Sequence, residues 1–179
     1  EMHVSLVGSE MCIRDRGQLV NETVWPELDY LVIDMPPGTG DIQLTLSQQI
    51  PVTGAVVVTT PQDLALADAR KGVAMFDKVS VPVAGLVENM SYHICSHCGE
   101  REHIFGAGGA EAMSEEFYLD ILAQIPLHID VREDIDAGCP TVVRRPDSEH
   151  THHYLELAEN VAAKMFWTGK ARPEAINFS

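Results

Sequence analysis

The chain has 179 residues, of which 45% are hydrophobic, and its 12 Lys and Arg residues against 27 Asp and Glu residues give a formal net charge of -15. This length suits one domain with a sizeable core. The negative charge would repel a nucleic acid or an anionic membrane surface, and the longest apolar runs fall far short of the roughly 20 residues that a membrane-spanning helix needs. The apolar cluster from Val4 to Val7 is too short for a signal-peptide core of about 7 to 15 residues. We therefore expect a cytoplasmic protein with no nucleic-acid or membrane partner.

The first 16 residues differ in pattern from the rest of the chain. Residues 1–16 lack the hydrophobic periodicity seen further on, and we interpret them as a foreign segment, with a divergent natural arm as the alternative. Residues 17–167 are predicted to form one domain, and residues 168–179 a tail.

From Leu28 onward, short apolar runs alternate with helix-like segments, which is typical of a parallel sheet covered by helices. Strands are predicted at Leu28 to Met35, Gly54 to Thr60, Val81 to about Met90, and near Ile121 to Pro126. The first is apolar on both faces, as a strand buried in a parallel sheet must be. The predicted fold class is α/β, with a mostly parallel sheet flanked by helices.

Helices are predicted between these strands. The expected segments are Asp41 to about Ile50, a helix with Thr60 as its N-cap, a short helix near Gly109 to Phe117, and a last helix from about Ser148 to Phe166. In the second helix, helical spacing predicts a buried stripe of Leu66, Ala69, Val73 and Phe76. The stretch from Ser91 to Gly109 breaks the pattern with Cys, His and Gly residues, and we interpret it as an ordered insertion that carries chemistry.

The string DMPPGTGD, from Asp34 to Asp41, follows the first predicted strand. Ligands of open α/β sheets bind beyond the carboxyl ends of strands, and a carboxylate there can hold the water shell of Mg²⁺ beside a nucleotide. Asp34 is the candidate for this role. The backbone N–H groups of Gly38, Thr39 and Gly40 could then sense the terminal phosphate. An Asp residue alone in this position is more typical of an ordinary strand end than of a nucleotide site. The whole eight-residue string favours the nucleotide-binding site.

Cys95 and Cys98 lie in the string ICSHCGE, at a spacing that lets both thiolates reach one metal or cluster. A structural zinc or a [4Fe-4S] cluster needs about four ligands, so two must come from elsewhere. A second copy of the chain could supply them. Alternatively, zinc could take two ligands from a set within this chain, namely His93, His97, His103 and Cys139. Spacing alone favours zinc over a cluster, and a cluster over a redox dithiol.

Other polar groups favour structural interpretations. The histidines near the start of the last helix, His150, His152 and His153, could bind a metal but are more simply a solvated helix end. Cys139 is most simply a small buried residue. Glu115 and Glu116 are expected on a solvated helix face.

Residues from about Leu28 to about Ala163 resemble the Mrp/ApbC family of P-loop iron-sulfur carriers, relatives of MinD-type ATPases. The resemblance rests on blocks in the family's order: LDYLVIDMPPGTGDIQLTLSQQIP, GAVVVTTPQDLALADARKGVAMF, VPVAGLVENMSYHICSHCGE and IFGAGG. It implies an ATP- and Mg²⁺-dependent homodimer that holds a shared [4Fe-4S] cluster on Cys95 and Cys98 and passes it to apo-proteins. It also implies that Asn89 recognises adenine, for which an amide at a strand's end is chemically suited.

The sequence departs from this family in one respect. The lysine-containing phosphate loop of GKGGVGK type does not occur in these 179 residues, so we expect a partial P-loop domain with weak or absent nucleotide binding in this polypeptide. Two alternatives remain, a zinc-stabilised interaction domain that works without nucleotide, and a MinD-like positioning ATPase.

Overall fold

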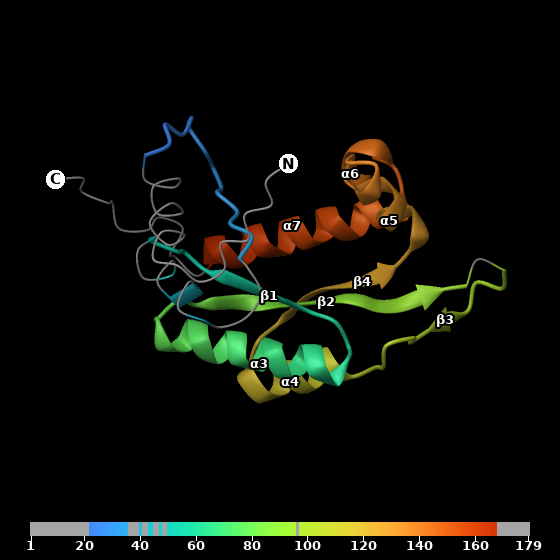
Figure 1. The fold of residues 1–179 in the computed structure, drawn as a ribbon, viewed down its shortest axis with the longest axis horizontal. Helices are drawn as coiled ribbons and strands as arrows, with labels where there is room; N and C mark the ends of the chain where they lie inside the picture. The colour runs from blue at the N-terminus through green and yellow to red at the C-terminus, as the bar shows by residue number, and fades with distance from the viewer. Residues whose placement is uncertain are drawn as a thin grey trace, which may run out of the picture.

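The computed structural model describes residues 22–35, 40, 43–44, 47, 50–95 and 97–167. These residues contain a four-stranded sheet with helices on both faces, as Figure 1 shows. The predicted α/β class is thereby confirmed. Among the described residues, none of the helices is long and apolar enough to cross a membrane.

The sheet is built around one long strand. Its strands are β1 (Ala55–Thr59), β2 (Val83–Ile94), β3 (Arg101–Glu102) and β4 (Ile121–Leu127). β1 and β4 both run parallel to β2 and pair with overlapping parts of it, so they occupy its two edges. β3 pairs antiparallel with the last two residues of β2. The sheet is mixed but mostly parallel, as predicted, and the third predicted strand continues past Met90 to Ile94.

Helices cover the two faces of this sheet unequally. They are α3 (Asp63–Lys78), α4 (Gly109–Phe117), α5 (Ile129–Asp136), α6 (Thr141–Arg144) and α7 (Glu149–Trp167). α3 and α4 lie on one face and α7 on the other, while β3 and the end of β2 project beyond the helices (Figure 1). The short helices α5 and α6 were not predicted from the sequence, because neither is long enough to show a helical repeat.

Two apolar clusters, one on each face, hold the layers together. Adjacent residues of a strand point to opposite faces, and so Leu86 of β2 packs toward α3 and α4 while Val87 packs toward α7. The first cluster contains the predicted stripe residues Leu66, Ala69 and Val73, with Phe76 packed against it.

The predicted strand at Leu28–Met35 is wrong in this structure. The segment is irregular, and Val32 is 89% exposed and Tyr30 61% exposed. An apolar run becomes a strand only when another strand accepts its backbone hydrogen bonds. Among the described residues, β1 has no strand on its outer edge, so residues 28–35 are not part of the sheet.

One helix start differs from expectation, and one predicted helix is described only in part. Gln62, not Thr60, is the N-cap residue of α3, and the Thr60 hydroxyl donates to the Gln62 side chain at 2.8 Å instead of capping the helix. Most of the helix predicted at residues 41–50 lies outside the described residues, although Gln43, Leu44 and Ser47 are helical. The last helix begins at Glu149, where the Ser148 hydroxyl accepts a hydrogen bond from the Thr151 N–H at 3.2 Å.

Candidate functional site

The candidate site is the turn that follows β2. Cys95 comes directly after Ile94, and the chain then reverses into β3. The N–H of Cys95 donates to the Glu100 carbonyl at 2.9 Å, and the N–H of Gly99 donates to the Cys95 carbonyl at 2.8 Å. Gly99 has a φ of 73°, in the left-handed region where glycine is favoured. The sequence C-x-x-C-G therefore forms a tight, hydrogen-bonded turn.

The turn activates one of its two thiols. The backbone N–H groups of Cys98 and His97 donate to the Cys95 sulfur, and with the Cys98 thiol they lower the pKa of Cys95. Hydrogen bonds to a sulfur favour the thiolate, which is the form that binds metals. Both cysteines are free, Cys95 half-buried and Cys98 exposed, so their sulfurs can be reached from outside.

Aromatic and basic side chains brace the base of the hairpin. Tyr92 is buried, and the Arg101 guanidinium lies 3.6 Å from the centre of its ring. The His103 ring meets Tyr92 edge-on, and its Nδ1 lies 3.1 Å from the Ser91 carbonyl oxygen. These contacts join the residue after β3 to β2 and hold the cysteine turn in one orientation.

The intrachain zinc ligands considered from the sequence do not gather around the cysteines. The Nδ1 atom of His93 lies 3.2 Å from the Leu127 carbonyl oxygen. Cys139 lies in the loop after α5. We predicted a buried Cys139, but it is half-buried. Within the described part of the chain, neither Cys95 nor Cys98 belongs to a group of three metal-ligating residues. The structure thus brings together two ligands at this turn.

The predicted nucleotide residues are not assembled. Asp34 is exposed in the irregular segment before residue 36, rather than at the end of a buried strand. Gly40 is exposed, while Gly38 and Thr39 lie outside the described residues. The expected geometry depends on a strand at residues 28–35, and that strand does not form here.

Asn89 lies inside β2 and not at the end of the strand as predicted, because β2 continues to Ile94. It stands opposite Ile125 of β4, just before the register shifts, and Met90 has a φ of 56°. The Asn89 side-chain oxygen accepts a hydrogen bond from the Met90 N–H at 2.9 Å. In this structure Asn89 supports a local irregularity of the strand, and its role toward adenine stays a prediction.

Glu88 is a polar residue that the sequence reasoning missed. Its side chain is 1% exposed and accepts hydrogen bonds from the Ser91 hydroxyl at 2.5 Å and the Ala110 N–H at 3.2 Å. It thereby connects the cysteine-bearing strand to the first turn of α4. In the sequence, a single carboxylate within a predicted apolar strand is the signal that indicates such a buried polar residue.

Of the three histidines near the start of the last helix, only His152 is exposed as we expected. Its Nδ1 lies 2.8 Å from the Ser148 carbonyl oxygen. In contrast, His150 Nδ1 and His153 Nε2 are buried atoms. Burial, together with His128, lowers the pKa of His150. The prediction was wrong for His150 and His153, which lie on the inner side of the first turns of α7. Glu115 and Glu116 are exposed as predicted.

A mostly parallel sheet, helices on both faces and a cysteine turn after its central strand define an α/β protein with two accessible thiols on a hairpin. The profile described as "ParA: NUBPL iron-transfer P-loop NTPase" matches residues 9–162. The chain belongs to this family of iron-transfer P-loop NTPases, as its resemblance to the Mrp/ApbC carriers implied. The match begins within residues 1–16, whose interpretation as a foreign segment stays a prediction.

Two relatives show how far the likeness extends. The chain is 66% identical over 162 residues to the iron-sulfur cluster carrier protein of Haemophilus influenzae, which covers 90% of this chain and 44% of that protein. It is 50% identical over 157 residues to the iron-sulfur cluster transfer protein NUBPL of Mus musculus, covering 88% and 48%. The chain therefore spans about half the length of the relatives it matches.

A solved structure agrees with the fold. The nucleotide-binding protein of Archaeoglobus fulgidus, in complex with ADP and with Co found in it, is 37% identical with a TM-score of 0.65. The likeness covers 78% of this chain and 55% of that one.

Proposed function

We propose that this chain binds an iron-sulfur cluster through Cys95 and Cys98 and passes it to apo-proteins. The observation that carries the proposal is the cysteine turn, in which backbone N–H groups stabilise the Cys95 thiolate and both sulfurs are accessible. The relatives named as cluster carriers and cluster transfer proteins support it. We place this chemistry in the cytoplasm, where thiols stay reduced.

We further propose that two copies share one [4Fe-4S] cluster. Such a cluster takes four thiolates, and within the described residues each chain offers two at this turn with no third ligand beside them. A two-fold arrangement of hairpins supplies four equivalent sulfurs. The hairpin projects beyond the helices (Figure 1), so two hairpins can meet without a clash between the helical layers.

Cluster release follows from the same geometry. Cys98 is exposed, so a thiolate of an acceptor protein can replace it on iron first, after which Cys95 is displaced in turn. The exchange replaces one thiolate with another at each step and needs no oxidant or reductant. An apo-protein with its own cysteine ligands is therefore the partner that we propose.

A coupling to ATP and Mg²⁺ is proposed for the full-length proteins of this family. The GKGGVGK-type loop does not occur in these 179 residues, so we expect weak or absent nucleotide binding in this polypeptide alone. The ADP named with the Archaeoglobus fulgidus protein supports the coupling. In this proposal Asp34 acts toward Mg²⁺, the Gly38 to Gly40 turn toward the terminal phosphate, and Asn89 toward adenine. Because residues 28–35 lie outside the sheet, nucleotide binding requires this segment to join the sheet beside β1.

Anaerobic reconstitution with iron and sulfide tests the cysteine site. The chain should gain visible absorbance and transfer its cluster to an apo-ferredoxin, and both Cys95→Ser and Cys98→Ser should abolish these properties. Cys139→Ser is the matched control and should keep them. If the double cysteine variant still assembles a transferable cluster, the proposal is wrong.

A further inference from the structure

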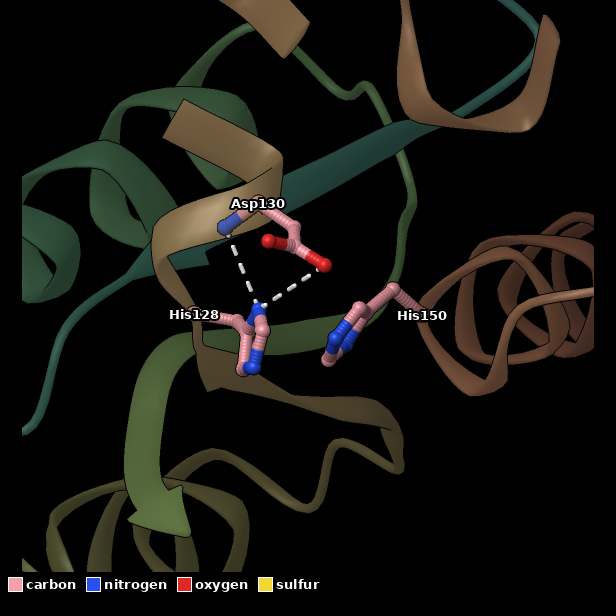
Figure 2. A group of neighbouring side chains, drawn as sticks. All are labelled: His128, Asp130 and His150. Atoms are coloured by element: carbon pink, nitrogen blue, oxygen red, sulfur yellow. Dashed lines mark hydrogen bonds and ion pairs between the residues drawn. The ribbon is translucent and has the colours of Figure 1, made fainter. Parts of the chain in front are cut away.

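A second group of metal-ligating side chains lies apart from the cysteines. His128 is the N-cap residue of α5, Asp130 belongs to the first turn of α5, and His150 to the first turn of α7. One ligand atom from each residue lies within 4.8 Å of the other two (Figure 2). The two imidazole rings face each other, with centroids 4.1 Å apart and planes inclined by 35°. Two imidazoles and one carboxylate thus converge from the starts of two helices, α5 and α7.

Hydrogen bonds hold these ligands in place. The Asp130 N–H donates to His128 Nδ1 at 3.1 Å (Figure 2), and Arg145 Nη1 donates to Asp130 Oδ2 at 2.7 Å. Arg145 Nε also donates at 3.0 Å to Asp134, whose side chain is fully buried. Of these contacts, the Arg145 donor to Asp130 is of the kind that fixes the orientation of a metal ligand and raises its affinity. The two ends of α5 and the loop before α7 are therefore tied into one network.

His150 supplies an independent sign of a missing partner. Its Nδ1 is a buried atom without a hydrogen bond, one of two such side-chain atoms in the described part of the chain. Buried polar atoms almost always have a partner, and an exception requires an explanation. A cation in the plane of the His150 ring, bonded to Nδ1, would satisfy this atom.

We propose that His128, Asp130 and His150 form a binding site for a divalent first-row transition metal. Two histidines and one carboxylate that leave coordination positions open are a ligand set for Fe²⁺, Co²⁺ or Zn²⁺. Metal–ligand distances of about 2.0–2.2 Å require the three ligand atoms to approach each other. His128 Nδ1 accepts the Asp130 N–H in this structure, so metal binding requires the His128 ring to release that hydrogen bond and turn a nitrogen lone pair toward the ion. The hard ions Mg²⁺ and Ca²⁺ prefer oxygen ligands and are excluded as occupants.

The site lies at the same end of the sheet as the cysteine hairpin. β2 and β4 are parallel neighbours in which His93 pairs with Leu127. Cys95 follows two residues after His93, and His128 follows directly after Leu127, so both sites lie beyond this end of the sheet. The histidine site uses no cysteine and does not depend on the cluster proposal.

Metal titration of the full chain with Cys95→Ser and Cys98→Ser tests the site without the thiolates. Under anaerobic conditions, Co²⁺ should bind at one ion per chain in the micromolar range, without a sulfur charge-transfer band, and Zn²⁺ or Fe²⁺ should displace it. In the same background His128→Ala and His150→Ala should each weaken binding by at least about tenfold. His152→Ala, an exposed neighbour on the same helix turn, should leave the affinity unchanged.

A second readout remains informative if a variant fails to fold. In the cysteine-free chain, Zn²⁺ should shift the ring ¹⁵N resonances of His128 and His150 but not that of His152. The absence of Co²⁺ binding up to millimolar concentration, equal affinity in the folded His150→Ala variant, or unshifted ring resonances of His128 and His150 would overturn the proposal.

Discussion

The backbone N–H of Ala110 donates a hydrogen bond to the buried Glu88 carboxylate at 3.2 Å. Glu88 therefore lies at the N-terminal end of α4, where unpaired N–H groups and the helix dipole favour a negative charge. The same side chain accepts from the Ser91 hydroxyl and, at 3.3 Å, from Gln124 of β4. One carboxylate thus connects the strand that carries the cysteines, the neighbouring strand and the helix below them.

Glu88→Ala should destabilise the protein by about 1–3 kcal/mol, because it leaves buried hydrogen-bond donors without an acceptor. Urea unfolding followed by circular dichroism measures the change. Glu115→Ala removes an exposed carboxylate from the same helix and should stay within about 0.5 kcal/mol of the parent. Equal losses in the two variants would contradict the role assigned to Glu88.

Gly109, the last glycine of IFGAGG, allows α4 to approach α3. A Cβ atom on Gly109 would lie 2.5 Å from Leu66 Cδ1, and Leu66 is 4% exposed in the core. Gly109→Ala should therefore cost about 1–3 kcal/mol of unfolding free energy. Gly72→Ala, with nothing within 4 Å of the added atom in the middle of α3, should instead stabilise by up to about 1 kcal/mol. A thermal melt in which both variants move in the same direction would contradict this packing.

The sequence predicted strands best where they pair with β2. β1 and β4 lie within one residue of their predicted limits, because a mainly apolar run specifies each of them. The run from Leu28 to Met35 is also mainly apolar, yet it forms no strand among the described residues. Composition indicates that a segment could be a strand, whereas hydrogen bonding to a neighbour decides whether it becomes one.

The side of α7 that carries Tyr154 packs on the sheet. Burial raises the pKa of Tyr154 above its ordinary value of 10.0, since the neutral phenol is favoured away from water. The corresponding stability is fully present below the unfolded pKa and is lost as the pH rises through the folded pKa. In an alkaline titration of the folded protein, phenolate absorbance follows the ionisation of the tyrosines. The Tyr154→Phe variant should lack a part of the absorbance change whose midpoint lies above pH 10. If the missing part instead has its midpoint below pH 10, the packing of this face of α7 is contradicted.

The cysteine turn makes a prediction about reactivity. Hydrogen bonds from the N–H groups of Cys98 and His97 lower the pKa of Cys95, so its thiolate forms at lower pH in the folded chain than in the unfolded one. Iodoacetamide alkylation, quantified by peptide mass, should give a lower pH midpoint for Cys95 in buffer than in urea. An unchanged or higher midpoint in the folded chain would show that the turn does not donate to this sulfur.

The candidate sites differ in how much of them the sequence reveals. Cys95 and Cys98 are close in sequence, so their spacing alone predicts a common ligand. His128, Asp130 and His150 come from two helices that only the fold brings together, through α5, which is too short for a periodic signal. The sequence predicts the position of Asn89 only in part: it indicates the strand that carries Asn89 but not the continuation of β2 past Met90.

The central claim is that two chains hold one cluster between their Cys95 and Cys98 pairs. Native mass spectrometry of the anaerobically reconstituted protein tests it most directly, because it weighs chains, iron and sulfide together. We predict a species of two chains with four iron and four sulfide ions that Cys95→Ser converts to cluster-free chains. A single chain that retains a complete cluster, or a single chain that holds one zinc ion at these cysteines, would contradict the account.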